Sequence, residues 1–211
     1  MTAATGKQAN TLRRQRNKRG EGAKLRAMIL DSAQSLLEES GDEASVTIRA
    51  VTRRAGIAPQ SFYLQFPTLG SLLFAMYGTA FQALHDALVS AGNDAPDPHE
   101  RLAVISRAYV DFALSNPGRY RALMSSRGVL HDEWDQYELP GAGTFALLRD
   151  AVAAARASEP GDAQALHVAA TLAWTQLHGM SVLMIDRPTF PWPPVETLLG
   201  VVLNQWRALT T

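Results

Sequence analysis

Polar side chains that could recognise another molecule gather in one short stretch, TRRAGIAPQSFYLQF, residues 52–66. Gln60 and Ser61 stand directly after a proline, and Tyr63 and Gln65 follow within about one and a half helical turns. Amide and hydroxyl groups both donate and accept hydrogen bonds, so they suit the edges of nucleic-acid bases, and a tyrosine hydroxyl can donate to phosphate. The stretch is too short for a core of its own, so other elements must hold it in place.

Those other elements are predicted to be helices throughout, because apolar residues recur with the helical period along most of the chain. We expect an all-α fold of about nine helices, with no strand and no internal repeat. The first four are predicted near Leu25–Gly41, Ile48–Ala55, Pro59–Gln65 and Leu69–Ala91. The other five are predicted near 102–115, 118–125, 144–157, 163–186 and 195–206.

The second and third predicted helices match a helix-turn-helix, with the longer first helix as a brace. Thr47 can cap the second helix, and Pro59 suits the first turn of the third. Between them Gly56 supplies the positive φ angle that reverses the chain. In such a motif the third helix enters a major groove with its N-terminal residues at the base edges. A plain helical hairpin is the alternative interpretation of the same pattern.

Charge is distributed unevenly along a chain whose net charge is zero. Residues 1–26 hold eight basic residues and one acidic residue, whereas the rest of the chain holds 12 basic and 19 acidic residues. A basic arm on an acidic body predicts a polyanion as the partner of the arm, with Arg14, Arg16 and Arg19 as candidate contacts. A solubilising disordered tail is the alternative, and residues 1–22 are expected to be disordered in either case.

Composition limits the remaining possibilities. The 211 residues are 46% hydrophobic, enough for a substantial core, and include no cysteine, which excludes disulfides and thiolate chemistry and is compatible with a reducing cytoplasm. The polar N-terminus has no apolar segment typical of a signal peptide. The most apolar stretch, residues 166–185, carries polar residues and is predicted to be a buried helix rather than a membrane span.

Other chemistry has little support in the sequence. The run HDEWD, residues 131–135, gathers possible metal ligands, but in a predicted loop and without the usual histidine spacing. The pair Ser125 and Ser126 does not form a nucleophile elbow, and no glycine-rich phosphate loop occurs. We therefore expect no catalytic residue, no cofactor and no metal site.

Residues 45–73, SVTIRAVTRRAGIAPQSFYLQFPTLGSLL, resemble the DNA-binding segment of TetR-type transcriptional regulators. The matching features are Thr47, the turn Ala55-Gly56-Ile57, the pair Phe62-Tyr63 and Phe66, in that order and spacing. The stretch AYVDFALSNPGRYRALM resembles the junction of the fifth and sixth helices in that family. In the eighth helix, Trp174 and His178-Gly179 resemble the subgroup named for a Trp and a His-Gly pair.

This resemblance implies a role for each matched position in the DNA-binding segment. Arg49 would either pair with a guanine edge or contact a phosphate, and the sequence leaves both open. Tyr63 would clamp a phosphate. The full set of implied DNA contacts, beyond the arm, comprises Thr47, Arg49, Pro59, Gln60, Ser61, Tyr63 and Gln65.

The sequence departs from the family pattern at several positions. Leu69 stands where a phosphate-binding lysine is common, and Ala50 leaves Thr47 without a reciprocal capping partner. Ala58 replaces the usual hydroxyl cap of the third helix, and Leu64 brings no charge. We expect the basic arm, with Arg53 and Arg54, to compensate for these losses.

The resemblance also implies three parts: a basic arm (1–22), a helix-turn-helix domain (23–68) and a ligand-binding and dimerisation domain (69–211). A dimer would pair the last two helices of each copy through Leu172, Leu177, Leu183, Leu198, Val202 and Trp206. Plain core packing is the alternative for these residues.

A ligand pocket is expected between the fourth, fifth, seventh and eighth helices, with the sixth closing one end. Its candidate lining is Tyr109, Phe112, Met124, Phe145, Trp174 and His178. Any of these can instead be an ordinary core residue, and His178 is more simply a hydrogen-bonded core histidine. The implied function is a cytoplasmic, ligand-responsive dimeric regulator that represses from a palindromic site in double-stranded DNA, with a small apolar effector and no membrane. The alternative is a helical enzyme or small-molecule carrier that has lost DNA binding.

Overall fold

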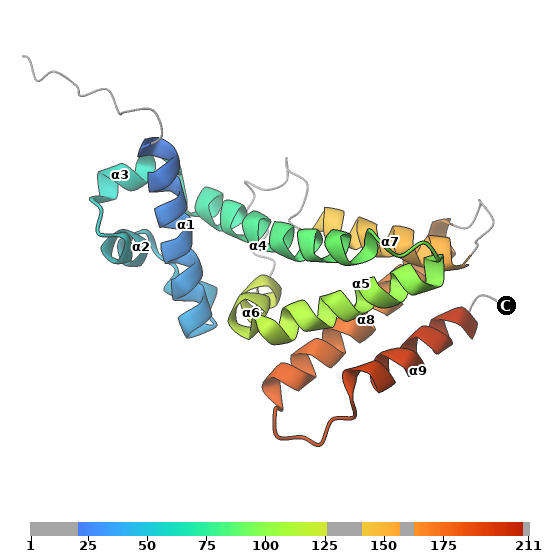
Figure 1. The fold of residues 1–211 in the computed structure, drawn as a ribbon. Coiled ribbons are helices and arrows are strands. Elements are labelled where there is room, and N and C mark those ends of the chain that lie inside the picture. Colours follow the sequence, from blue (N-terminus) through green and yellow to red (C-terminus); the bar gives the residue numbers. More distant parts are fainter. Residues whose placement is uncertain (1–20, 126–140, 157–162, 209–211) are drawn as a thin grey trace, which may run out of the picture.

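A computed structural model of the chain describes residues 21–125, 141–156 and 163–208. Within these ranges it contains nine α-helices, one short 3-10 helix (η1) and no strand, which confirms the all-α prediction. The elements are α1 (Glu21–Ser40), η1 (Glu43–Ser45), α2 (Ile48–Ala55), α3 (Pro59–Tyr63), α4 (Leu69–Gly92), α5 (Pro98–Ser115), α6 (Pro117–Ser125), α7 (Ala142–Arg156), α8 (Ala163–Asp186) and α9 (Val195–Ala208). Figure 1 shows α1–α3, which we call the head, at one end of the molecule, and α4–α9, the body, at the other.

The head has its own hydrophobic cluster. Ile29, Ala33 and Leu37 recur along one face of α1 and are almost fully buried against Val51 of α2 and Phe62 of α3. Residues from the first half of α4, such as Met76, complete this cluster. Because α2 and α3 are too short to be stable alone, the packing of α1 and α4 fixes their crossing angle.

Local capping chemistry sets the boundaries within the head. Thr47 accepts a hydrogen bond from the backbone N–H of Ala50 at 3.1 Å, and Gly56 ends α2 with a φ angle of 64°. Ala58 has no capping side chain, as expected. At the start of α4, Thr68 and Ser71 each accept a hydrogen bond from the other's backbone N–H, a capping box that the sequence analysis did not predict.

Three details differ from the sequence predictions. Helix α1 begins at Glu21, so the last two residues of the predicted arm are helical, while residues 1–20 lie outside the described part of the chain. Helix α3 ends at Tyr63 rather than at Gln65, because the chain must turn there for Phe66 to reach the core, where it is 1% exposed. The 3-10 helix η1 was not predicted; the side chain of Asp42 caps it.

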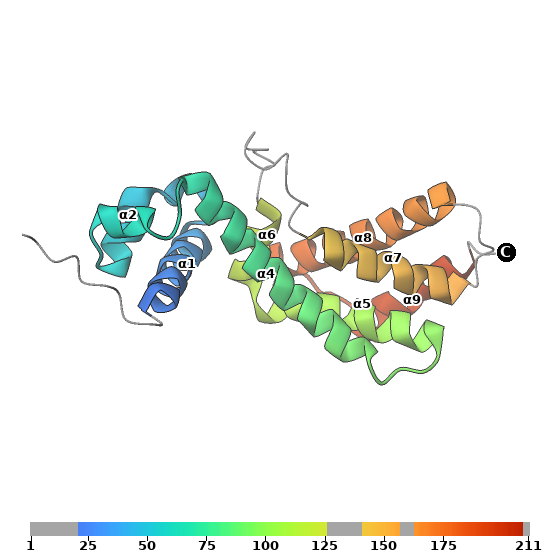
Figure 2. The ribbon, with the colours of Figure 1, turned by 90° about the horizontal axis from the view of Figure 1, so that it is seen from above.

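The body is built around α5, which packs against α4, α7, α8 and α9 (Figure 2). Its core combines Leu84 and Leu88 of α4 with Ile105, Tyr109 and neighbouring residues of α5 and with buried residues of α7 to α9. Helix α6 is the exception, because it lies between the body and α1 and contacts both.

Helix α8 has 24 residues and, among the described residues, is the only helix long and apolar enough to cross a bilayer by length and composition. Only 28% of its most apolar stretch is buried, although the sequence predicted a buried helix. One side packs against α5 and α7, and the other side is exposed in the single chain.

The packing of Phe62 gives a test of the head. We expect Phe62→Ala to lower the free energy of unfolding by about 3–5 kcal/mol, since this side chain is 0% exposed and its loss leaves a cavity at the junction of α1, α3 and α4. Leu64→Ala is the matched control: Leu64 is 66% exposed, and its truncation should change stability by less than about 0.5 kcal/mol. Urea unfolding of both variants measures the difference; equal losses would contradict the proposed core.

Candidate nucleic-acid interface and internal pocket

The head presents one exposed polar surface, formed by the start of α2 and by α3. Arg49, Gln60 and Tyr63 are exposed on it, Tyr63 by 55%, and Ser61 and Gln65 are half-buried. Thr47 and Pro59 are also exposed, at the first turns of their helices. All seven predicted contacts of the helix-turn-helix segment are therefore at least partly accessible to solvent. Arg14, Arg16 and Arg19 lie outside the described residues.

Adjacent residues of α3 face opposite ways, with Phe62 buried and Tyr63 exposed. Phe62 points into the core, and its ring meets the Tyr63 ring edge-on, with centroids 5.5 Å apart. Phe62 also lies 5.9 Å from the ring of Phe66. The guanidinium of Arg26 stacks over Phe66 at 4.3 Å and donates to the carbonyl of Gln65 at 3.4 Å. These contacts hold the end of α3 against α1, so Tyr63 projects outward from a supported position.

The basic residues of α2 differ in what they contact. Both terminal nitrogens of Arg54 donate to the carboxylate of Glu39, at 2.8 and 2.6 Å, and this hydrogen bonding lowers the pKa of Glu39. Arg54 is thus paired with α1, so the predicted compensation for missing DNA contacts would require it to leave this surface ion pair. Arg53 remains exposed.

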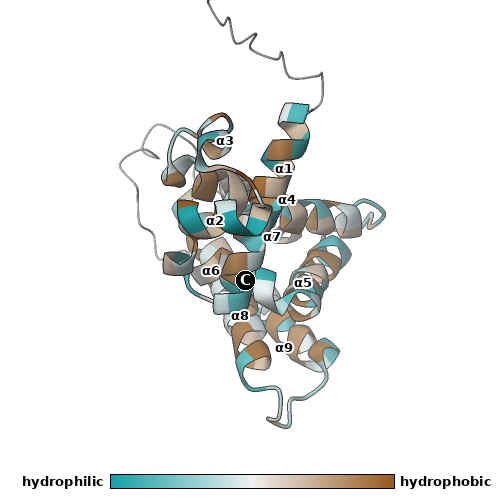
Figure 3. Cartoon of the chain, turned by 90° about the vertical axis from the view of Figure 1, so that its left-hand side faces the viewer, coloured by the Kyte–Doolittle hydropathy of each residue, from teal (hydrophilic) through white to brown (hydrophobic). Residues whose placement is uncertain are grey.

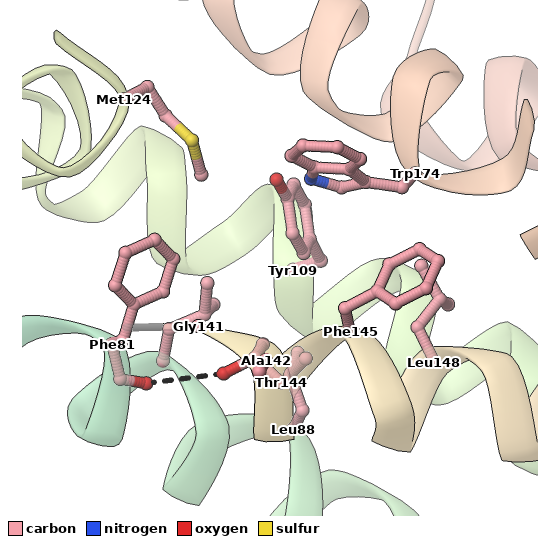
Figure 4. A pocket seen from close by; sticks show the side chains of 11 residues that line it. Phe81, Leu88, Tyr109, Met124, Gly141, Ala142, Thr144, Phe145, Leu148 and Trp174 are labelled. Carbon is pink, nitrogen blue, oxygen red and sulfur yellow. Dashed lines mark hydrogen bonds between the residues drawn. The ribbon is translucent and has the colours of Figure 1, made fainter. Parts of the chain in front are cut away.

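The body contains an apolar cavity of about 250 Å³ between α4, α5, α7 and α8, with Met124 of α6 at one end. Its walls are aliphatic and aromatic, and none of the described lining residues carries a formal charge. Figure 4 shows the side chains converging on this space. The lining residues are Phe81, Leu84, Leu88, Tyr109, Met124, Gly141, Ala142, Thr144, Phe145, Leu148 and Trp174.

Of the six predicted lining residues, the cavity contains Tyr109, Met124, Phe145 and Trp174. Phe112 does not line it, because this side chain, nearly one turn after Tyr109, packs against the main core. His178 does not line it either and is instead a hydrogen-bonded histidine, one turn beyond Trp174.

The sequence analysis missed the α4 wall and the first turn of α7. Phe81, Leu84 and Leu88 continue an apolar stripe that reads simply as core, and only the position of α7 shows that a space remains above them. The Thr144 hydroxyl donates to the carbonyl of Phe81 at 3.5 Å and ties α7 to α4 beside the cavity (Figure 4).

Three polar side chains from different helices meet beside the cavity. The hydroxyls of Tyr109 and Tyr120 lie 2.9 Å apart, and the Tyr120 hydroxyl lies 2.8 Å from Nδ1 of His178. Burial raises the pKa of both tyrosines and lowers the pKa of His178, so all three groups favour their neutral forms. Tyr120 was not predicted; its position on α6 could have suggested an inward-facing side chain, but not its partners.

The outer side of α8 and α9 carries exposed apolar residues, visible as brown segments in Figure 3. Leu172 and Leu183 are 47% and 52% exposed, and Val168 and Val201 are exposed to a similar degree. Leu198 and Val202 are half-buried.

Two of the predicted dimer residues belong to the chain's own core instead. Leu177 is 0% exposed and Trp206 is 8% exposed. Leu177 faces α5 in the core cluster, and the indole N–H of Trp206 donates to Gln176 within the same chain. Neither side chain is available to a partner.

The helical head and the six-helix body agree with the comparisons with known proteins. Residues 102–199 match the family model described as tetracyclin repressor-like, C-terminal domain. A Rhodococcus sp. RHA1 protein of unknown function is 25% identical, with a TM-score of 0.68 over 89% of this chain and 96% of that one. A putative TetR-family transcription regulator from Shewanella sp. PV-4 is 16% identical, with a TM-score of 0.64 over 88% and 95%.

Residues 102–199 thus form a tetracyclin repressor-like C-terminal domain, and the chain shares its fold with a putative TetR-family regulator. A third similar structure is FadR from Bacillus subtilis in complex with stearoyl-CoA, 13% identical, with a TM-score of 0.67 over 86% of this chain and 97% of that one. Within the described residues of this regulator there is no group of three or more potential metal ligands, and the run 131–135 lies outside them.

Gly141 forms the tightest point of the cavity wall and gives a test of it. Its φ angle is 95°, and a Cβ added there would lie 2.7 Å from Cε1 of Phe81. Gly141→Ala should therefore lower the free energy of unfolding by about 1–3 kcal/mol, through backbone strain and overpacking.

Gly143→Ala is the control for this substitution, because an added Cβ meets nothing within 4 Å there and the residue is helical. It should be neutral or stabilise the regulator by up to about 1 kcal/mol. Thermal unfolding of the two variants measures the contrast. Equal stability of both would show that the Phe81 contact is not tight.

Proposed function

We propose that the protein is a homodimeric repressor that binds a palindromic operator in double-stranded DNA and is released by a small apolar effector. The observation that carries the DNA-binding part is the exposed surface of Arg49, Gln60 and Tyr63, held on a rigid head core. A third helix positioned in this way can place its first residues against base edges in a major groove. A five-residue α3 reads few bases, so a second copy is needed for specificity.

Dimerisation is supported by the exposed apolar side of α8 and α9. Leu172, Leu183 and Val201 are each about half exposed, and side chains of this kind on adjacent helices rarely face water in a soluble monomer. Pairing this side with the same side of a second copy forms an isologous interface between the bodies. The heads are then free to contact two half-sites about 34–36 Å apart, or a multiple of that distance.

The effector part rests on the cavity between α4, α5, α7 and α8. Its apolar walls suit an organic molecule rather than an ion, and the FadR structure, which has a similar fold, is in complex with stearoyl-CoA, a ligand with a long apolar chain. Release requires only that the ligand binds better to an arrangement of the heads that no longer fits the operator. We expect no catalytic activity and a cytoplasmic location.

The direct test of this function is a gel shift of the purified protein with the DNA that flanks its own gene. A discrete complex on a palindrome, resistant to competitor DNA at physiological salt, is the expected result. Binding without sequence preference, seen only at low salt, would instead support a helical carrier or enzyme that has lost DNA recognition.

Arg49 distinguishes base reading from phosphate contact. If Arg49 pairs with a guanine, Arg49→Ala should weaken operator binding about 5- to 150-fold and relax specificity at one base pair. If it contacts a phosphate, the loss should be uniform across sequences and the salt slope should fall by about 1. Arg101→Ala, an exposed arginine on α5, is the control. Fluorescence anisotropy at several salt concentrations measures both; unchanged binding would remove Arg49 from the interface.

Leu183 tests the dimer. Wild-type protein should have twice the chain mass of 22.9 kDa in size-exclusion chromatography with light scattering. Leu183→Glu should shift it towards the single-chain mass, because a dimer would bury the new carboxylate without a partner. Leu64→Glu introduces the same charge at an exposed leucine of the head and should leave the mass unchanged. A monomeric wild-type protein would refute the proposed pairing.

A further inference from the structure

The three polar side chains beside the cavity form a continuous path between three helices. Tyr109 belongs to α5, Tyr120 to α6 and His178 to α8. The two oxygen–oxygen and oxygen–nitrogen distances, 2.9 and 2.8 Å, are those of good hydrogen bonds. Both tyrosines are almost fully buried, at 2% and 0% exposure, so breaking these bonds without a new partner leaves buried hydroxyls unsatisfied. These hydrogen bonds therefore belong to the interior of the body rather than to its surface.

The hydrogen atoms along this path have one consistent direction. Burial favours neutral His178, whose Nδ1 can accept from the Tyr120 hydroxyl. Tyr120 has then used its only hydrogen, so Tyr109 donates to it. The indole nitrogen of Trp174 faces the Tyr109 hydroxyl (Figure 4), and an indole N–H can only donate. The sequence of donors is Trp174, Tyr109, Tyr120 and finally His178 as acceptor, an arrangement in which each bond strengthens the next.

The cavity meets this path at its first two members only. Tyr109 and Trp174 line the cavity, whereas Tyr120 and His178 do not. Figure 4 shows the Tyr109 hydroxyl directed towards the indole of Trp174, at the edge of the space. A ligand in the cavity can therefore reach Tyr109 and Trp174 but neither Tyr120 nor His178.

Size and polarity restrict which ligand can do this. An apolar cavity of about 150 Å³ accommodates benzene, so about 250 Å³ accommodates two fused rings. A charged group would lose its water among aromatic and aliphatic walls, and none of the described lining residues could neutralise it. A single hydroxyl or carbonyl, in contrast, would find Tyr109 and Trp174 as partners.

Tyr120 carries the far end of the path into the helix that contacts the head. In α6, the preceding residue, Arg119, has its Nε 3.7 Å from a carboxylate oxygen of Glu38 in α1. Gly118 lies so close to α1 that an added Cβ would be 3.5 Å from the Cβ of Glu38. On the other side, Arg121 pairs with Asp186 of α8 at 2.8 Å. Helix α6 is thus held between α8 and α1, and its Tyr120 is hydrogen-bonded to Tyr109, which lines the cavity.

We propose that the effector is an uncharged molecule about the size of two fused rings, whose single polar group hydrogen-bonds to Tyr109 and displaces its bond with Tyr120, which loosens α6 from its position against α1. This inference rests on the proposed function, since it names the ligand class and the regulation of the same pocket. Tyr120 acts as a positioning residue: it touches α5 and α8 but not the ligand.

Three probes of equal ring size separate the parts of this proposal: 2-naphthol, which is neutral and has one hydroxyl, naphthalene, which has none, and 2-naphthoate, which is an anion. Operator affinity without any probe is measured first. 2-Naphthol should then bind, quench Trp174 fluorescence and weaken operator binding about tenfold, within the usual range of allosteric coupling. Naphthalene should bind about fivefold more weakly, for want of one hydrogen bond, and leave operator affinity almost unchanged. 2-Naphthoate should bind at least about tenfold more weakly than 2-naphthol.

Two variants test the path itself. Tyr120→Phe keeps the ring but removes the hydroxyl, so it should bind 2-naphthol as the wild type does, while the effect on operator affinity disappears. Tyr109→Phe should bind 2-naphthol and naphthalene about equally, because the anchoring hydroxyl is lost; this affinity ratio provides a second readout if Tyr120→Phe is unstable. Tyr77→Phe is the matched control, since Tyr77 is 2% exposed and bonds to Glu43 in the head cluster, away from the cavity.

Each outcome has a definite meaning. No operator binding before any probe is added would refute the proposed function itself. Normal operator binding with equal affinity for 2-naphthol and 2-naphthoate, or with no binding of 2-naphthol, would refute the ligand class and leave the proposed function standing. A Tyr120→Phe protein, or a Tyr109→Phe protein, that responds to 2-naphthol like the wild type would refute the role of the path.

Discussion

Leu72 and Leu88 lie on the same helix, four turns or more apart, yet they belong to two different hydrophobic clusters. The first half of α4 completes the core of the head, and the second half forms part of the core of the body. Phe81 lies between these halves, packs towards the head cluster and lines the cavity. Because α4 is unbroken over 24 residues, the head cannot change its orientation independently of this helix. Helix α4 therefore contributes to the cavity wall, supports the exposed surface of α2 and α3, and connects the two.

A second connection runs through α6. Glu38 of α1 meets Gly118 and Arg119 of α6, and Tyr120 on the same helix is bonded into the interior of the body. The head is thus attached to the body at two places that differ in character. The attachment through α4 is covalent and apolar, whereas the attachment through α6 depends on hydrogen bonds and an ion pair, whose strength changes with any group that competes for them. Only the second kind can be altered by a single polar atom in the cavity.

Much of the head could be predicted from the sequence, because its signals are local. Thr47, Gly56 and Thr68 fix helix ends through bonds to residues within four positions, and the pattern of Val51 and Phe62 identifies their buried faces. The sequence prediction ends α3 two residues too late. Burial of Phe66 in the core requires the chain to leave the helix after Tyr63, although the neighbouring residues fit a helical pattern. The body was less predictable. Tyr120 and His178 are 58 positions apart, and nothing in either neighbourhood indicates that they meet. The same reason explains why the sequence analysis assigned Leu177 to the outer face and missed Phe81. The way the helices cross determines which side of each helix is buried, and the sequence does not show those crossings.

The length of α4 has a consequence for the scale of movement at the DNA. At about 1.5 Å per residue, its 24 residues span about 36 Å, so the helix is a stiff lever with the cavity wall near its middle and the head at one end. A tilt of about 5° moves one end of such a rod relative to the other by about 3 Å, close to the rise of about 3.4 Å between successive bases. A displacement of about 1.5 Å near Phe81, at the middle of this helix, would therefore be sufficient to move the two heads of the proposed dimer out of register with the base pairs of an operator.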